Sequence, residues 1–214
     1  MTQPELFDGP ALLPLAPGAC VLRGFAAADA PALWACLQAE VLPQAPWRHL
    51  VTPGGYTMSV AMTNCGRVGW VSDSSGYRYD PVDPLSGQSW PGMPPALLQL
   101  AAQAAAAAGF PGFVPDACLV NHYVAGSRLS LHQDRDERDH QAPIVSVSLG
   151  LPATFLFGGL RRTDRPQRLR LDHGDVVVWG GPSRLAYHGV APLAAGEHAL
   201  LGACRVNLTF RKAL

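Results

Sequence analysis

The chain has 214 residues, of which 48% are hydrophobic and 15% charged, a composition that excludes a disordered protein and allows one domain with a buried core. The formal net charge is zero, so no overall field attracts the protein to nucleic acid or to an anionic membrane. Five cysteines occur without a CxxC pair, which argues against a disulfide framework or a structural zinc site. The sequence begins without a signal-peptide pattern and has no apolar run long enough to cross a bilayer. We therefore expect a cytoplasmic protein without a membrane partner.

The first half of the chain predicts two helices separated by a β-rich segment. Residues 1–20, rich in Pro, Gly and Ala, should form an extended arm, and residues 27–42 have the apolar spacing of a surface helix. Residues 46–95 are punctuated by Gly and Pro and contain many aromatic residues and short strands, such as 56–62, which is typical of a flap. The alanine-rich stretch 97–108 predicts a second helix that ends at Gly109.

Beyond Pro115 the pattern changes to short strands joined by turns, as in a β-sandwich or jelly-roll barrel. We expect strands at residues 117–124, 144–149, 154–157, 168–171, 176–179, 185–190 and 204–211. The sequence therefore predicts one continuous, mostly β domain with flanking helices. Its expected parts are an arm and helix (1–45), a flap (46–95) and a core (96–214).

An H-x-D motif, His132-Gln133-Asp134, provides candidate metal ligands. In an extended chain the side chains at positions i and i+2 point the same way, so this imidazole and carboxylate share one face. Together with a distant histidine, for which His188 is the natural candidate, they would form the two-His-one-carboxylate triad of non-haem iron(II) oxygenases. Such a triad leaves coordination positions open for a co-substrate and dioxygen. Taken alone, an H-x-D pattern is weak evidence.

A second H-x-D pattern, His173-Gly174-Asp175, tests how specific that motif is. It stands where a turn must precede the apolar stretch 176–179. Its separation from His188 is also short, about one hairpin. We therefore interpret the second pattern as a turn and prefer the first as the metal site.

The predicted C-terminal strand, residues 204–211, alternates completely between apolar and polar residues. One face carries two arginines and an asparagine, which is what a buried dicarboxylate requires, although a half-exposed strand would show the same alternation. Arg205 and Arg211 are separated by roughly 20 Å of extended chain, so they could bracket a short dianion between them. Asn121 and Tyr123 share a face of another strand and could add donors to the same ligand.

The H-x-D motif, His188 and the R-x-N-x-x-x-R pattern at residues 205–211 resemble the AlkB family of iron(II)/2-oxoglutarate-dependent nucleic-acid dealkylases, most closely its bacterial founding member. The resemblance runs from about residue 51 to residue 211. It implies a double-stranded β-helix (jelly-roll) core, with iron(II) as cofactor and 2-oxoglutarate and dioxygen as co-substrates. By this resemblance the iron ligands are His132, Asp134 and His188. The residues that hold 2-oxoglutarate are Asn121, Tyr123, Arg205, Asn207 and Arg211, and no further catalytic residue is expected.

The resemblance also implies the reaction, which is oxidative demethylation of N-alkylated bases of the 1-methyladenine and 3-methylcytosine type. Decarboxylation of 2-oxoglutarate would be coupled to hydroxylation of the methyl group and its release as formaldehyde, a direct reversal of DNA damage. The substrate-binding residues would be Met62, Trp70, Tyr77, Tyr79, Asp136 and Arg162. Phosphate contacts would come from Arg128, Arg135 and Arg161. The flap aromatics could instead pack a small satellite core, and Asp136 could belong to a solvated acidic loop.

Two other functions remain compatible with the residues. A dioxygenase of the same barrel could hydroxylate a small molecule or a protein side chain, although it would have no use for an aromatic flap with an arginine fringe. A metal-free binding module of similar fold would tolerate changes at His132 or Asp134. The sequence does not separate DNA from RNA, or single from double strands, and a monomer would suffice because one chain carries the complete site.

Overall fold

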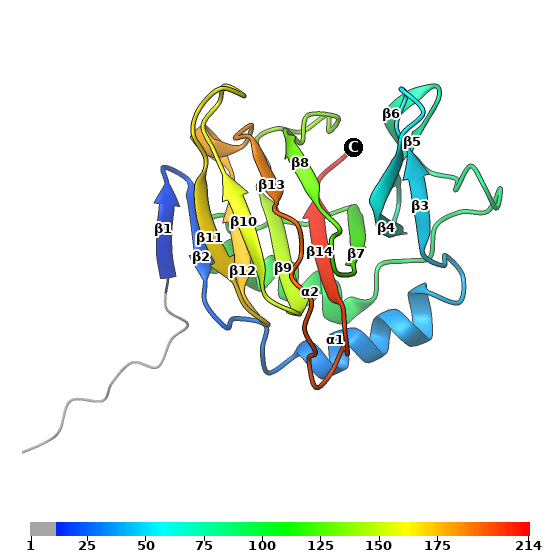
Figure 1. Cartoon of the computed structure of the whole chain (residues 1–214), viewed down its shortest axis with the longest axis horizontal. Helices are drawn as coiled ribbons and strands as arrows, with labels where there is room; N and C mark the ends of the chain where they lie inside the picture. Colours follow the sequence, from blue (N-terminus) through cyan, green and yellow to red (C-terminus); the bar gives the residue numbers. More distant parts are fainter. Residues whose placement is uncertain (1–11) are drawn as a thin grey trace, which may run out of the picture.

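The computed structural model describes residues 12–214, arranged as a large and a small antiparallel sheet with two helices and a projecting hairpin (Figure 1). The large sheet has eight strands in the order β1 (Leu12–Ala16), β2 (Ala19–Leu22), β12 (Val176–Trp179), β9 (Ile144–Gly150), β14 (Arg205–Arg211), β7 (Ala117–Tyr123), β4 (Thr57–Gly66) and β3 (Arg48–Val51). The small sheet has four strands in the order β11 (Gln167–Leu171), β10 (Ala153–Phe157), β13 (His188–Val190) and β8 (Leu129–His132). The predicted jelly-roll fold is confirmed.

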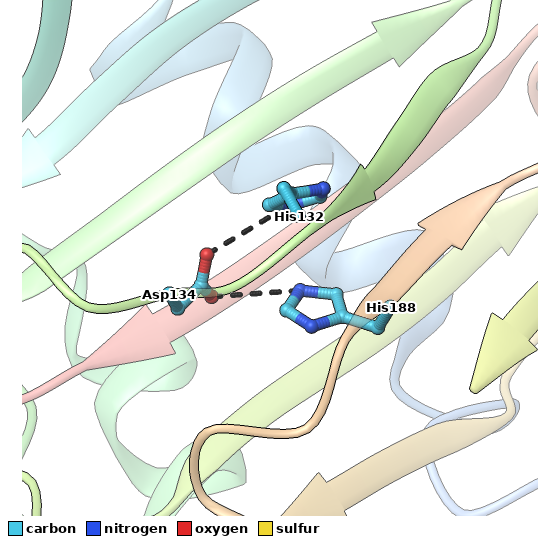
Figure 2. A group of neighbouring side chains, drawn as sticks. All are labelled: His132, Asp134 and His188. Atoms are coloured by element: carbon cyan, nitrogen blue, oxygen red, sulfur yellow. Dashed lines mark ion pairs between the residues drawn. The ribbon is translucent and has the colours of Figure 1, made fainter. Parts of the chain in front are cut away.

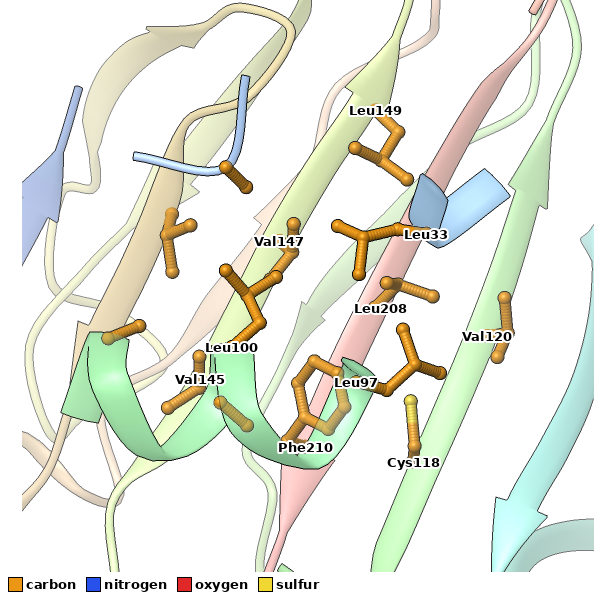
Figure 3. Packing of buried hydrophobic residues seen from close by; sticks show 14 of the residues in the cluster. Leu33, Leu97, Leu100, Cys118, Val120, Val145, Val147, Leu149, Leu208 and Phe210 are labelled. Atoms are coloured by element: carbon orange, nitrogen blue, oxygen red, sulfur yellow. The ribbon is translucent and has the colours of Figure 1, made fainter. Parts of the chain in front are cut away.

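The helices are α1 (Ala30–Cys36), which continues as a π-helical turn (Leu37–Val41), and α2 (Pro95–Ala107); a 3-10 turn spans Gly181–Ser183. Both helices pack on one face of the large sheet. Figure 3 shows Leu33 of α1 and Leu97 and Leu100 of α2 directed at apolar side chains of β7, β9 and β14. All are removed from water, and burying each large aliphatic side chain contributes about 1.5–3 kcal/mol before entropic losses. No helix in residues 12–214 combines the length and apolar character needed to cross a membrane.

The alternation within strands decides which side chains reach the space between the two sheets. Val145, Val147 and Leu149 of β9 face the helices, so the intervening Ser146 and Ser148 face the small sheet. The same rule divides β14 into the helix-facing row Val206, Leu208 and Phe210 and an opposite polar row. A second apolar cluster, which includes Phe155, Phe157, Val177 and Trp179, fills the space between the sheets beside this polar row.

Most of the predicted elements are confirmed, with differences at their ends. The helix expected at residues 27–42 begins only at Ala30, because the preceding residues form a turn. The strand expected at residues 185–190 is reduced to His188–Val190, since the Ala186 N–H bonds back to the Ser183 carbonyl at 2.9 Å. Residues 1–11 of the expected arm lie outside the described residues.

The segment expected as a flap contains two different parts. Its strands β3 and β4 extend one edge of the large sheet, with β4 paired to β7. The remaining strands, β5 (Gly69–Asp73) and β6 (Gly76–Asp80), form a separate two-stranded hairpin. In Figure 1 this hairpin stands beside β3 and β4, away from the β10–β11 side of the barrel.

Candidate active site

Three potential metal ligands converge where β8 and β13 meet. His132 ends β8 and pairs in register with His188 of β13, and Asp134 follows two residues after His132. The Asp134 carboxylate lies between the two rings, with Oδ1 at 3.7 Å from His132 Nε2 and Oδ2 at 3.8 Å from His188 Nε2 (Figure 2). These separations are too long for hydrogen bonds, and the ligand atoms all lie within 4.8 Å of one another. In residues 12–214 no other group of three such side chains converges in this way.

Both histidine rings are oriented so that Nε2 is available as a ligand atom. His132 Nδ1 lies 2.8 Å from the Ser130 carbonyl, and His188 Nδ1 lies 3.0 Å from the Ala186 carbonyl. Because a carbonyl oxygen can only accept, each Nδ1 carries the proton and donates it, which leaves the Nε2 lone pair directed at Asp134.

The protonation states also fit a divalent metal. Burial, with a smaller contribution from His132, lowers the pKa of His188 to about 4, so this ring is neutral at physiological pH. Burial alone would raise the pKa of Asp134, but the Arg211 guanidinium and the two histidines outweigh it and hold that pKa well below its usual range. A carboxylate with two imidazoles is the donor set of non-haem iron(II), so the residues fit the metal.

A buried ionic network surrounds the carboxylate. Arg211 donates to Asp134 Oδ2 through Nε at 2.8 Å and Nη2 at 2.6 Å, and its Nε also lies 3.3 Å from Glu137 Oε1. Arg184 donates to Glu137 Oε2 at 3.1 Å and to the Asp134 carbonyl at 2.8 Å. All four side chains are buried. In this arrangement every buried charge has an opposite partner, as burial requires.

The polar row of β14 lies next to this network, and its hydrogen bonding is incomplete. Arg205 pairs in register with Tyr123 of β7, and Asn207 with Asn121. The Arg205 guanidinium, 1% exposed, lies 5.9 Å from the Tyr123 ring centroid and donates to Ser148 Oγ at 3.0 Å.

Several polar atoms of this row, and one of the neighbouring β7, have no protein partner. Within the described chain no partner exists for Arg205 Nε and Nη1, Arg211 Nη1 or Asn121 Oδ1. A buried guanidinium without a carboxylate is expensive, and accordingly burial lowers the pKa of Arg205. Two buried guanidinium groups with free donors on one strand face fit a dicarboxylate such as 2-oxoglutarate.

The β5–β6 hairpin faces the residues that follow the H-x-D motif. Trp70, Tyr77 and Tyr79 share one hairpin face, with Trp70 paired to Tyr79 and stacked on Tyr77 at 5.5 Å between centroids and 13° between planes. The Trp70 indole donates to Asp136 Oδ2 at 2.9 Å, and the Tyr79 hydroxyl donates to Glu137 Oε1 at 2.6 Å. The hairpin is therefore joined directly to the segment that carries the metal ligands.

Comparisons with known proteins agree with this geometry. A profile described as the 2OG-Fe(II) oxygenase superfamily matches residues 18–211. The chain is 60% identical over 200 residues to the alpha-ketoglutarate-dependent dioxygenase AlkB of Escherichia coli (strain K12), which covers 94% of this chain and 92% of that protein. The chain belongs to the AlkB family. Membership makes it an iron(II)/2-oxoglutarate-dependent dioxygenase with dioxygen as co-substrate, as the sequence predicted.

Other relatives extend the comparison within the AlkB family. The AlkB homolog of Caulobacter vibrioides (strain NA1000 / CB15N) is 49% identical over 171 residues, which is 79% of this chain and 76% of that protein. The solved structure of OsALKBH1 superimposes with a TM-score of 0.84 at 29% identity, over 94% of this chain and 100% of that one.

The remaining candidate residues of this dioxygenase differ in their exposure to solvent. Met62 on β4 is 3% exposed and stands opposite Asn121 in register. Tyr77 is 48% exposed. The exposed arginines expected to contact substrate or phosphate lie in loops, and in the described part of the chain their guanidinium groups make no hydrogen bond: Arg128, Arg135, Arg161 and Arg162.

Sequence reasoning missed four side chains that shape the site. Glu137 and Arg184 carry no recognisable spacing, since one lies in an acidic loop and the other directly follows a 3-10 turn. Ser146 and Ser148 did leave a signal, because they alternate with apolar residues in β9. Reading that alternation as an inward polar row would have identified both as neighbours of Asn207 and Arg205.

Proposed function

We propose that this dioxygenase removes alkyl groups from the ring nitrogens of nucleobases in DNA, with 1-methyladenine and 3-methylcytosine as the typical substrates. The observation that carries the proposal is the aromatic hairpin face, whose Trp70 and Tyr79 donate to the two acidic residues beside the metal ligands. The relation to AlkB supports the same reaction. RNA bases with the same alkylation present the same chemistry and are included in the proposal.

The roles of the inner residues follow from their contacts. His132, Asp134 and His188 would hold iron(II), and the β14 arginines would bind 2-oxoglutarate, with Arg205 at its distal carboxylate. Asn121, Tyr123, Asn207 and Arg211 would complete that pocket. With metal, 2-oxoglutarate and dioxygen bound, the centre supplies the oxidant that hydroxylates the N-methyl group. The chain itself orients the ligands and keeps bulk water away, since the polar residues of the pocket are buried.

The outer residues would bind the extruded base. Stacking of a base on an aromatic side chain is worth about 1–3 kcal/mol, and the stacked Trp70–Tyr77 pair offers such a surface. Met62 would line the same pocket, and Tyr79 would fix the hairpin through Glu137. A base methylated at a pairing nitrogen is cationic, so the Asp136 carboxylate would favour it over the neutral base.

The exposed arginines would place the nucleic-acid strand. Arg162 would contact the base or its adjoining backbone, and Arg128, Arg135 and Arg161 would bind phosphates. Their exposure makes such contacts geometrically accessible, and phosphate contacts give affinity that falls steeply with salt. Because the chain has no net charge, these four arginines would have to provide the electrostatic attraction to the nucleic-acid backbone.

We further propose that the enzyme works as a monomer in the cytoplasm, with residues 1–45, 46–95 and 96–214 acting as one continuous unit. One chain carries all three metal ligands and the pocket strand. The five cysteine thiols are free, which is the state that a reducing compartment maintains.

The proposal is tested with a short single-stranded oligonucleotide that contains one 3-methylcytosine. The protein is loaded anaerobically with iron(II) and 2-oxoglutarate, air is admitted, and the oligonucleotide mass and succinate are measured. Loss of the methyl group that requires both iron and 2-oxoglutarate supports the proposal. Succinate without any change of the oligonucleotide contradicts the substrate, and no succinate contradicts the assigned metal and 2-oxoglutarate residues.

A pair of tyrosine variants tests the aromatic face. Tyr77→Leu should raise the KM for the oligonucleotide about fivefold or more, because it removes one stacking surface. Tyr56→Leu is the matched control, since Tyr56 is exposed and lies outside the hairpin. Equal KM values for the two variants would remove Tyr77 from the substrate site.

A further inference from the structure

The β-ladder that joins the two metal-ligand segments stops at the metal site. His132 and His188 form the terminal pair of the β8–β13 ladder, and neither Gln133–Asp134 nor residues 184–187 belong to a strand. The backbone that carries Asp134 is therefore not fixed to the neighbouring segment by strand pairing. Arg211 of β14 holds the Asp134 carboxylate, but the backbone that carries Asp134 still needs a connection to the segment before His188.

Two side-chain bonds cross between these segments where the ladder ends. Gln133 Nε2 donates to the Leu185 carbonyl at 2.6 Å, and Arg184 Nη1 donates to the Asp134 carbonyl at 2.8 Å. Each segment thus supplies one side-chain donor and one backbone acceptor. The two bonds replace the missing ladder with a reciprocal clamp.

The remaining donors of Arg184 strengthen the same connection. Its Nε donates to the Ala142 carbonyl at 3.0 Å and its Nη2 donates to Glu137 at 3.1 Å. Of the three partners, Asp134 ends the H-x-D motif and Glu137 and Ala142 belong to the segment that follows it, while Arg184 itself lies four residues before His188. A planar guanidinium with a fixed fork of donors can hold three acceptors in one geometry, which a lysine cannot do.

We propose that Gln133 and Arg184 are positioning residues that preset the separation of Asp134 and His188 for the metal. The proposal gives the middle residue of the H-x-D motif a function. Residues that orient a metal ligand are typically worth about 10–100-fold in metal affinity or activity, because a ligand set that must be ordered on binding binds more weakly. The inference rests on the proposed assignment of His132, Asp134 and His188 as metal ligands.

The test measures metal affinity directly, with cobalt(II) as the probe and no 2-oxoglutarate or substrate present. Metal-free protein is titrated with cobalt(II), followed by calorimetry and by the visible ligand-field bands. Gln133→Met keeps the length of the side chain but removes the donor, and Gln141→Met is the control because Gln141 is exposed on the same connecting segment. We expect Gln133→Met to bind cobalt(II) about 10–100-fold more weakly than the control, with altered ligand-field bands.

The outcomes separate the clamp from the ligand assignment. Cobalt(II) affinity and bands that are the same in Gln133→Met and Gln141→Met would overturn the clamp while leaving the ligands in place. Failure of the unmodified protein to bind cobalt(II) would overturn the ligand assignment itself.

Arg184→Lys supplies a second, independent measurement. It keeps a cation beside Glu137 but cannot serve the Asp134 carbonyl at the same time. The expected result is again weaker cobalt(II) binding, measured at a urea concentration of zero where the metal-free variant is folded, together with a lower urea midpoint because buried acceptors lose a donor. An affinity equal to that of the Arg138→Lys control, an exposed position, would contradict the role of Arg184.

Discussion

The segments His132-Gln133-Asp134 and His173-Gly174-Asp175 have the same pattern of imidazole and carboxylate. The first begins at the last residue of β8, and the second immediately precedes β12. In the first, the Asp134 carboxylate and both histidine Nε2 atoms are directed at one point. In the second, Asp175 accepts from the Gly24 and Asp172 backbone N–H groups and from Arg23 Nη1 at 2.5–2.8 Å. His173 Nδ1 accepts the Gly150 N–H at 3.0 Å.

The two segments differ in whether the lone pairs of their imidazole and carboxylate atoms already accept hydrogen bonds from the protein. At residues 173–175 the lone pairs satisfy backbone donors and close a turn, as the sequence predicted, so they are not available to a metal. At the first motif the backbone carbonyls accept the Nδ1 protons of His132 and His188 instead, which leaves both Nε2 atoms free, and Arg211 occupies only Oδ2 of Asp134. A short motif becomes a site only when its tertiary neighbours leave such atoms unsatisfied.

The largest expected effect separates the two aspartates. Asp134→Ala should reduce succinate formation by more than the about 10–100-fold typical of residues that only orient a ligand, because it removes a ligand itself. Asp175→Ala should retain turnover per folded molecule but lose about 2–3 kcal/mol of stability, since it leaves buried backbone donors unpaired. Succinate assays and urea unfolding on both variants measure these effects. Near-normal turnover in Asp134→Ala would refute the triad.

The second-largest expected effect is the difference in stability loss between the arginines that pair with the two aspartates. Arg211 is buried and neutralises both Asp134 and Glu137, so Arg211→Met should lower stability by about 3–5 kcal/mol and abolish turnover. Arg23 is one-third exposed beside Asp175, so Arg23→Met should change stability by about 1 kcal/mol or less. Urea unfolding compares the two. Equal losses would mean that burial does not distinguish the two ion pairs.

The residues that follow the two motifs differ in exposure, and the expected effect of changing them is smaller. The second motif is followed by the buried core strand β12, whereas the first is followed by the exposed Asp136. Asp136→Asn keeps an acceptor for the Trp70 indole and removes only the charge. It should lower kcat/KM for a cationic methylated base about fivefold, equivalent to about 1 kcal/mol, without changing 2-oxoglutarate consumption in the absence of substrate. A parallel fall in both rates would place Asp136 with the metal centre instead.

Strand alternation made the inner site predictable from the sequence. The polar row Arg205, Asn207 and Arg211 could be predicted because the residues between them on β14 are apolar. The same alternation on β7 predicted that Asn121 shares a face with Tyr123. The rule works here although β14 lies in the middle of the sheet, between β7 and β9. A strand covered on both faces usually reads as a continuous apolar run, so the polar alternation of β14 shows that its two faces meet different surroundings, the helices on one side and polar side chains on the other.

The residues outside that pattern could not be found from the sequence. Glu137 and Arg184 meet because a loop after β8 and a 3-10 turn before β13 pack together, and no local spacing encodes that contact. The expected short strand at residues 56–62 extends to Gly66, where β4 pairs with β7. Its place in the large sheet depends on pairing with a strand far away in the sequence, and the positions of glycine and proline residues do not predict such pairing.

The smallest expected effect concerns protonation at the second motif. Burial, together with the adjacent His198 ring at 4.3 Å, lowers the pKa of His173. The unfolded chain therefore binds more protons than the folded one below about pH 6.5. The stability that His173 contributes is complete above that pH and is lost as the pH falls through the lowered folded pKa.

His173→Asn keeps an acceptor for the Gly150 N–H but cannot be protonated. The free energy of unfolding of this variant, measured in urea from about pH 7 to about pH 5, should fall less steeply than that of the unmodified protein. His140→Asn is the control, because His140 is exposed. His188 destabilises the metal-free protein in acid in the same direction, since its pKa is also lowered, to about 4, but that contribution is common to all three proteins. If the slopes of His173→Asn and His140→Asn coincided, the Gly150–His173 bond would not depend on the neutral ring.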